Sequence, residues 1–321
     1  GNENAKSELV VNGDLDVTAI NSGAKAMGIY AAGNADVTVN GNLKMNNGAE
    51  WAVDGKEGSF GYYDAVGIYA TSNMGPNSMG AKVVVNGDMD LKVNGNGMFT
   101  NAGGSTIDTK GDVAVEVKKD NRKGYAALRA EDGVVNVNVV KDGSGKVTGA
   151  DSHKVNLKGN VAVTTGAVNS VDTKGTLSAV NLGLSTADSS LHGVVYNAFK
   201  DEGKVQQGVT FTGESNLVLE NGATWTNEKY GITGESWGGE AFAGSKVTSF
   251  IGGSDESKAG VIFQKDSNGI TINNYSGFTK VFYEHEAAGA EAAPVTMMRA
   301  AAAAPAAAPV TFKGGDITIK K

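Results

Sequence analysis

Histidine and cysteine, which supply many metal sites and catalytic groups, are scarce in this chain. The three histidines are His153, His192 and His285, and no two of them have the i, i+4 spacing of a helical metal site. The 321 residues include no cysteine, which excludes disulfides and thiolate metal sites. The sequence therefore predicts no metal, no cofactor and no catalytic residue.

Two pairs of aspartates, Asp14/Asp16 and Asp88/Asp90, occupy alternate positions after a glycine. Alternate residues of a strand share a face, so either pair could bind calcium with carboxylate oxygens. The same pattern fits a solvated strand face after a turn, which is the interpretation that we prefer. The glycine-aspartate nonapeptide of calcium-loaded β-rolls is not completed at Gly252-Gly253-Ser254-Asp255.

Aromatic residues in irregular, glycine-rich stretches are the remaining candidates for recognition. Tyr62, Tyr63 and Trp237 lie in such stretches. Exposed rings there could stack on sugar faces or anchor a protein contact. The alternative is that they cover the ends of an apolar core.

The elements that would position these residues come from one repeated phrase. Its clearest form is Val83-Val84-Val85-Asn86-Gly87-Asp88-Met89-Asp90-Leu91-Lys92-Val93, two alternating apolar strands around a glycine corner. Sequence segments of this kind predict corners at Gly13, Gly41, Gly87, Gly111, Gly159, Gly175, Gly213 and Gly314. Several of the spacings lie near 24 residues or twice that number. A period of this length is typical of a solenoid.

Asn-Gly between alternating apolar runs is also the strongest short signal for a β-hairpin. A type I′ hairpin turn needs positive φ at two residues, and Lys110 and Thr212 are poor choices for the first of them. We therefore predict a corner between successive strands of one coil, with a single glycine at positive φ. Stacked coils would let Asn12, Asn40 and Asn86 form a hydrogen-bonded ladder.

The alternation also predicts which residues form the core. Val85, Met89, Leu91 and Val93 should point inward, while the residues between them point outward. A second phrase, Gly-Ile-Tyr-Ala, supplies a third strand for each coil. Its tyrosines, Tyr30 and Tyr69, should stack in register. The fold class expected is all-β: a parallel β-helix of three-strand coils.

Composition agrees with short strands joined by tight turns, because the chain has 46 Gly, 4 Pro and 7% aromatic residues. The formal net charge of −7 and pI near 5.1 argue against a nucleic-acid partner. No run of 18 apolar residues could cross a membrane as a helix. We expect one domain, 1–321, with glycine- and aromatic-rich loops at 54–64 and 226–245 and a mobile Ala/Pro-rich excursion at 287–309.

Four phrases carry a family resemblance in addition to the corner and Gly-Ile-Tyr-Ala phrases. They are Leu217-Val218-Leu219-Glu220-Asn221-Gly222-Ala223-Thr224-Trp225, Asn47-Gly48-Ala49-Glu50-Trp51, Ile272-Asn273-Asn274-Tyr275-Ser276-Gly277 and Phe282-Tyr283-Glu284-His285. Over nearly its whole length the chain resembles passenger domains of bacterial autotransporters, of the pertactin and diffuse-adhesin kind. The resemblance implies a right-handed parallel β-helix that is exported across the outer membrane to the bacterial cell surface. It also implies a C-terminal translocator barrel, which this sequence lacks.

The function expected from this resemblance is adhesion to host cells, to matrix or between bacteria. The expected partners are surface glycans or matrix proteins, or a second copy that associates along the rod. A structural stalk that presents a distal binding domain is the first alternative. A polysaccharide-active β-helix enzyme is the second, but Arg122, Arg129 and Arg299 do not stand beside acidic pairs in a repeated frame.

Overall fold

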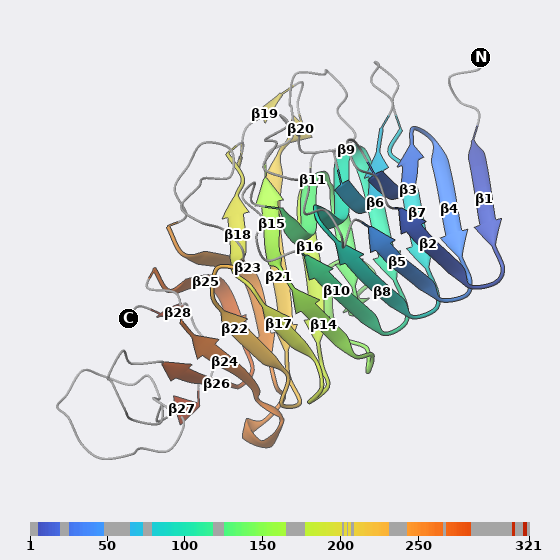
Figure 1. The fold of residues 1–321 in the computed structure, drawn as a ribbon. Helices are drawn as coiled ribbons and strands as arrows, with labels where there is room; N and C mark the ends of the chain where they lie inside the picture. Colours follow the sequence, from blue (N-terminus) through green and yellow to red (C-terminus); the bar gives the residue numbers. More distant parts are fainter. Residues whose placement is uncertain are drawn as a thin grey trace, which may run out of the picture.

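The chain folds as a parallel β-helix, as the repeats predict (Figure 1). The computed structural model describes residues 6–19, 26–47, 65–72, 79–117, 125–164, 177–200, 202–203, 205–206, 209–230, 243–265, 268–283, 310–311 and 317–319. In this part of the chain nearly every element is a strand, and the one helical element is the 3-10 turn η1 at Glu256–Lys258. No helix among these residues has the length and apolar character needed to cross a membrane.

The strands form three stacked columns, which we call faces 1, 2 and 3. Each of the first six coils contributes one strand to every column, and the later coils contribute described strands to faces 1 and 2. Face 1 contains β1 (Ser7–Val11), β4 (Ala35–Val39), β7 (Lys82–Val85), the second half of β9 (Asn96–Thr109), the second half of β11 (Ala126–Val137), β16 (Leu177–Leu184), β21 (Thr212–Leu219), β23 (Ser245–Gly252) and β25 (Ile270–Ser276). Neighbouring strands in this column pair in parallel, so each strand is bonded to its equivalent in the next coil.

Face 2 follows the corner in every coil. Its strands are β2 (Leu15–Ala19), β5 (Leu43–Asn47), β8 (Met89–Val93), β10 (Val113–Val117), β14 (Val155–Lys158), β17 (Ser190–His192), β22 (Thr224–Asn227), β24 (Gly260–Gln264) and β26 (Thr279–Tyr283). Face 3 contains β3 (Ala26–Ala32), β6 (Ala65–Thr71), the first halves of β9 and β11, β15 (Asn160–Thr164) and β18 (Val195–Ala198).

Four pairs of strands depart from this stacking. Two hairpins, β12 (Val139–Lys141) with β13 (Val147–Ala150) and β19 (Val205–Gln206) with β20 (Val209–Thr210), leave the coils. At the C-terminal end, β27 (Val310–Thr311) and β28 (Ile317–Ile319) pair antiparallel with β26 and β25. These last pairings cover strand edges that a further coil would otherwise occupy.

The core runs along the inside of the three columns, and the predicted alternation is confirmed. Val85 and Leu91 are fully buried, and Met89 and Val93 are each 3% exposed. Trp225 is the largest buried side chain, and its Nε1 donates a hydrogen bond to the carbonyl oxygen of Gly193 at 2.9 Å. A continuous apolar core thus links successive coils.

The corner prediction is confirmed, but its physical reason is wrong. Gly13, Gly41, Gly87 and Gly111 do connect face 1 to face 2, yet none of them has positive φ. At Gly41, an added Cβ would lie 2.5 Å from the carbonyl oxygen of Gly13 in the preceding coil. Glycine is required here because the corners of neighbouring coils stack too closely for a side chain.

Two of the other four predicted corners differ from this pattern, and two lie outside the described residues. Gly159 joins face 2 to face 3, because it follows β14 and precedes β15. Gly213 lies inside β21. Gly175 and Gly314 fall outside the described residues, as do the predicted loop at 54–64 and the tract at 287–309. Of the predicted loop 226–245, the two ends are parts of β22 and β23, and 231–242 lies outside the description.

Candidate functional site

The corners of the first five coils carry two parallel hydrogen-bond ladders. In the first, Nδ2 of Asn40 donates to Oδ1 of Asn12 and Nδ2 of Asn86 donates to Oδ1 of Asn40, both at 2.8 Å. This is the predicted asparagine ladder. It ends at Lys110, which occupies the same corner position in the next coil.

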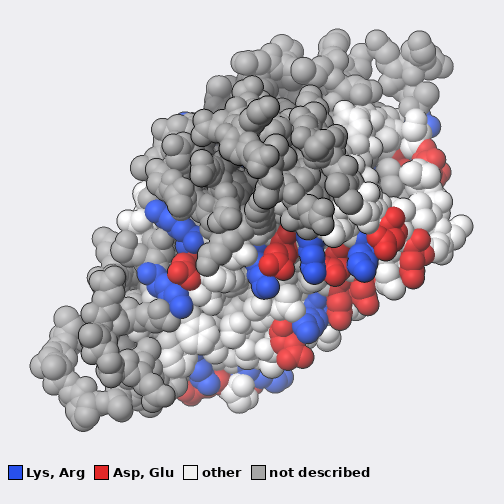
Figure 2. Space-filling view, in the orientation of Figure 1, with Lys and Arg blue, Asp and Glu red and all other residues white. Residues whose placement is uncertain are grey.

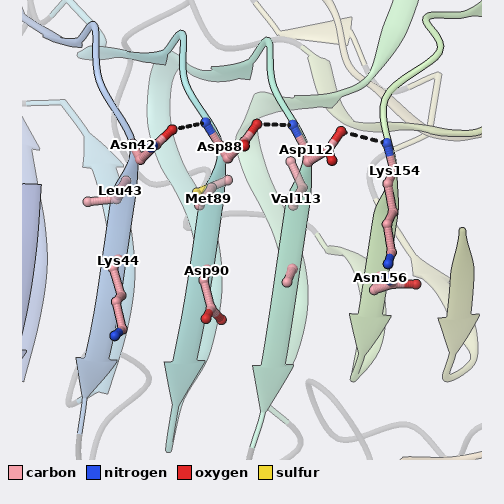
Figure 3. A pocket seen from close by; sticks show the side chains of 11 residues that line it. Asn42, Leu43, Lys44, Asp88, Met89, Asp90, Asp112, Val113, Lys154 and Asn156 are labelled. Carbon is pink, nitrogen blue, oxygen red and sulfur yellow. Dashed lines mark hydrogen bonds between the residues drawn. The ribbon is translucent and has the colours of Figure 1, made fainter. Parts of the chain in front are cut away.

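The second ladder joins side chains to backbone and was not predicted (Figure 3). Oδ1 of Asn42 accepts from the backbone N–H of Asp88 at 2.9 Å, Asp88 accepts from Asp112 at 2.9 Å, and Asp112 accepts from Lys154 at 2.9 Å. Asp14 starts the series by accepting from Asn42 at 2.7 Å. The recurrence of Asp or Asn directly after the corner glycine is the sequence signal for it.

This ladder gives the corner aspartates a structural role, as an alternative to calcium binding. No group of three or more acidic or histidine side chains that could hold a metal ion occurs within the described ranges. Asp90 points outward from β8, away from the ladder oxygen of Asp88 (Figure 3). The two aspartates of this pair therefore have different surroundings.

The outer side of face 2 carries charges of both signs (Figure 2). One row of outward residues is Asp16, Lys44, Asp90, Ala114, Asn156, Ser190 and Thr224, and the next is Thr18, Asn46, Lys92, Glu116, Lys158, His192 and Thr226. Over β2 to β14 these rows hold three acidic and three basic side chains. Lys158 Nζ lies 3.5 Å from Glu116 Oε2, and both side chains are about half exposed.

A shallow hollow of about 400 Å³ lies over β5, β8, β10 and β14 on this face. Its floor is low because Ala114 stands between the longer Asp90 and Asn156 in the first row. Lys154 and Asp112 border it at the corner (Figure 3). The hollow is open, polar at its edges and too shallow to enclose a small molecule.

One described histidine, His192, belongs to the second charged row, and the other, His153, lies beside the corner. His192 Nε2 lies 3.0 Å from Glu228 Oε2, and its ring meets the ring of Tyr230 edge-on at 5.2 Å. Burial raises the pKa of Tyr230 above its ordinary value. His153 Nδ1 lies 3.6 Å from Asp112 Oδ1. His285 lies outside the described residues.

The aromatic residues proposed as ligand contacts, Tyr62, Tyr63 and Trp237, also lie outside the described residues. The predicted stacking of Tyr30 and Tyr69 is confirmed, with ring centroids 5.6 Å apart. The stacked rings lie on the outer side of the sheet. Tyr30 at one end of the stack is 57% exposed, whereas Tyr69 is buried. The stack therefore offers one exposed ring and no extended aromatic platform.

The stack continues through Phe99 to a buried ion pair. Phe99 stacks on Tyr69 at 5.2 Å, and the guanidinium of Arg129 lies over Phe99 at 5.1 Å. Arg129 is paired with Glu131, which also accepts from Nδ2 of Asn101 at 2.8 Å. The side chains of this network are buried and bonded to one another, so Arg129 has a structural role.

A second hollow lies on face 1, beside the hairpin β12–β13. It has a volume of about 510 Å³ and extends over β16, β21, β23 and β25. Lys141 and Lys146 of the hairpin line one side, and Glu214 is the single carboxylate that lines it. The paired carboxylates of glycoside hydrolysis are not brought together in this groove.

Comparison with protein-family models, with curated proteins and with solved structures finds no match for this chain.

Proposed function

We propose that this chain is a surface-displayed adhesin of the autotransporter-passenger kind, and that it joins cells by binding a second copy of itself. The observation that supports this function is the charge pattern of face 2. Acidic and basic side chains alternate there between neighbouring strands, and the six charges over β2 to β14 cancel. A flat face of this kind can be complementary to itself.

The complementarity follows from two-fold symmetry. Two faces that meet are related by an axis lying in the plane between them, so either the strand direction or the coil order is inverted. We place the axis parallel to the strands, midway between β10 and β14. Glu116 of each copy then lies against Lys158 of the other, and Asp112 lies against Lys154.

This arrangement turns the existing pair of Lys158 and Glu116, 3.5 Å apart, into a cluster of four charges with alternating sign. The rest of the face fits the same axis. Asp90 and Lys44 of one copy face the uncharged Ser190 and Thr224 of the other, because the C-terminal half of the first row has no charge. Opposite charges thus meet at the centre, Asp90 and Lys44 meet neutral polar residues outside it, and Lys92 of the second row meets His192.

The expected affinity is low. Eight stacked strands span about 38 Å at 4.8 Å per coil, and the flat part of each strand is about 15 Å long. The contact is on the order of 500 Å² per copy, below the roughly 800 Å² of a stable interface. Many copies on each of two facing surfaces would convert such weak contacts into firm attachment.

Bead aggregation tests the proposal. We would couple the purified chain to micrometre-sized beads at high density and follow clumping by light scattering as salt is raised. We expect clumping at low salt that declines above about 0.15 M, where charges beyond about 8 Å are screened. Beads that stay dispersed at every salt concentration would contradict self-association and favour the stalk hypothesis.

A further inference from the structure

The groove on face 1 is a site of different construction from face 2. One wall is the hairpin β12–β13, which is docked on the sheet at Gly183. A Cβ at Gly183 would lie 2.6 Å from Cβ of Ala150 in β13, so only glycine allows this approach. Nδ2 of Asn138, at the base of the hairpin, donates to the carbonyl oxygens of Gly183 and His153, both at 3.1 Å. The wall is therefore fixed to the floor.

The tip of the hairpin is ordered by its own hydrogen bonds. Oδ1 of Asp142 accepts from the backbone N–H of Ser144 at 2.9 Å and from that of Lys146 at 3.0 Å. The hydroxyl of Ser144, which also donates to Oδ1 at 2.6 Å, lowers the pKa of Asp142, and these backbone bonds lower it further, which favours the ionised carboxylate that orders the tip. Lys141 and Lys146 are thereby held side by side at the two ends of the turn.

A third ladder, formed by hydrogen bonds between side chains, ends at the floor of the groove. Asn136 donates to Asp108 at 2.6 Å, Asn181 donates to Asn136 at 2.8 Å, and Asn216 donates to Asn181 at 2.8 Å. Asn216 also donates to Glu214 at 3.0 Å, so both of its N–H groups are used. The ladder breaks at the next strand, where Ser249 occupies the asparagine position.

This break leaves polar atoms with no partner in the described structure. Oδ1 of Asn216 and Oγ of Ser249 make no hydrogen bond there, and Asn274 uses only its Nδ2, which donates to Thr248. The ammonium groups of Lys141 and Lys146 have no ion-pair partner there. Partial desolvation lowers the pKa of Lys141, although the charges of Asp108 and Glu214 oppose this shift.

We propose that this groove binds an acidic oligosaccharide. A carboxylate of the sugar lies against Lys141 and Lys146, and its hydroxyl groups bond to Asn216, Ser249 and Asn274. Lys141 and Lys146 are the two cationic side chains that line the groove, and Glu214 is the one carboxylate that lines it, while Asp108 and Asp142 lie close to the lysines outside the lining. This site is independent of self-association, because it lies on face 1 and not on face 2.

The shape and lining favour a sugar over a peptide. The floor crosses four parallel strands, which span about 14 Å at 4.8 Å per strand, a length that suits a short oligosaccharide. The backbone groups of these strands already pair with one another, so no sheet edge is open for an added peptide strand. Val134 and Leu177 give the apolar patches on which the C–H face of a sugar ring can rest.

Calorimetric titration with matched probes tests the site. The probes are oligosaccharides containing uronic or sialic acid, each paired with the same molecule after chemical reduction of its carboxylates to alcohols. We expect at least one acidic member to bind roughly ten-fold or more tightly than its reduced form, since a charge-assisted hydrogen bond contributes about 1.5–3 kcal/mol. If no acidic oligosaccharide binds more tightly than its reduced form, the proposal is overturned.

Three variants locate the binding. Lys141→Met should lower the affinity for the acidic probe about ten-fold and leave the affinity for its reduced form unchanged. Asn274→Ala should lower the affinity for both forms. Lys82→Met, which removes an exposed lysine from β7 of the same face, is the matched control and should change neither. Equal affinity of the Lys141→Met variant and the parent chain for the acidic probe would place binding elsewhere and refute this site.

Discussion

Replacing corner glycines by alanine should separate two explanations of the corner. In the first four coils, Gly13, Gly41, Gly87 and Gly111 occupy equivalent positions, and all four avoid positive φ. If stacking is what demands glycine, alanine should be tolerated only where no neighbouring backbone lies against the added Cβ. Gly13 is that position, because nothing lies within 4 Å of a Cβ built there.

The expected magnitudes come from the contacts. At Gly87 the added Cβ would lie 2.5 Å from the carbonyl carbon of Gly41, and at Gly111 it would lie 2.5 Å from the carbonyl oxygen of Gly87. These atoms belong to backbone and cannot rotate away, so two coils must separate. Overpacking of this kind costs about 1–3 kcal/mol, and we expect Gly87→Ala to be near the upper end. Gly13→Ala should be neutral or stabilising by up to about 1 kcal/mol, because alanine restricts the unfolded chain.

Urea unfolding followed by far-UV circular dichroism measures the difference in the free energy of unfolding. Hydrogen exchange would place the loss of protection in the strands beside the altered corner, β5 and β8 for Gly87→Ala. Equal destabilisation by Gly13→Ala and Gly87→Ala would refute the stacking explanation. It would instead indicate a backbone conformation that only glycine adopts.

Three further predictions concern buried polar groups. Trp225→Phe should cost about 2–3 kcal/mol in urea unfolding, because it leaves a void and removes the bond to the carbonyl oxygen of Gly193; no loss would contradict the burial of the indole. Asn181→Ala breaks two ladder bonds at a residue 4% exposed and should cost about 2–3 kcal/mol, whereas Asn12→Ala breaks one exposed bond and should cost under about 1 kcal/mol; equal costs would contradict the ladder account. Burial raises the pKa of Tyr275 to about 12, so the stability that its neutral form contributes is complete below pH 10 and is lost as pH rises to 12. The chain should lose about 1–2 kcal/mol more over this range than Tyr275→Phe, because solvent screening at this partly buried ring reduces the effect of two pKa steps of 1.36 kcal/mol, and parallel pH profiles would contradict the raised pKa.

Much of the fold could be predicted because its main signals are local. Alternation along Val83 to Val93 fixes which side chains point inward, and Asn12, Asn40 and Asn86 recur at one corner position. The reason for the corner glycine could not be predicted, since it depends on the distance to the neighbouring coil. Gly213 was assigned to a corner from its spacing, although it lies within a strand.

The candidate surfaces were less predictable than the core. The hairpin that walls the groove interrupts the repeat at 139–150, where no periodicity marks a function. Its local signal is Asp142-Gly143-Ser144-Gly145, which is typical of a hairpin turn. The charged rows of face 2 are visible in the sequence only after the strands are aligned, because Glu116 and Lys158 are 42 residues apart.

Mixing charge-reversed variants tests the central claim of self-recognition most directly. Glu116→Lys and Lys158→Glu should each abolish bead clumping alone, because each sets like charges against one another twice across the two-fold axis. A mixture of beads carrying the two variants should clump again, since both contacts then join opposite charges. The controls are Glu8→Lys and Lys82→Glu on face 1, which change the net charge equally and should clump alone as the parent chain does. Single variants that clump like the parent, or a mixture that stays dispersed, would contradict the account.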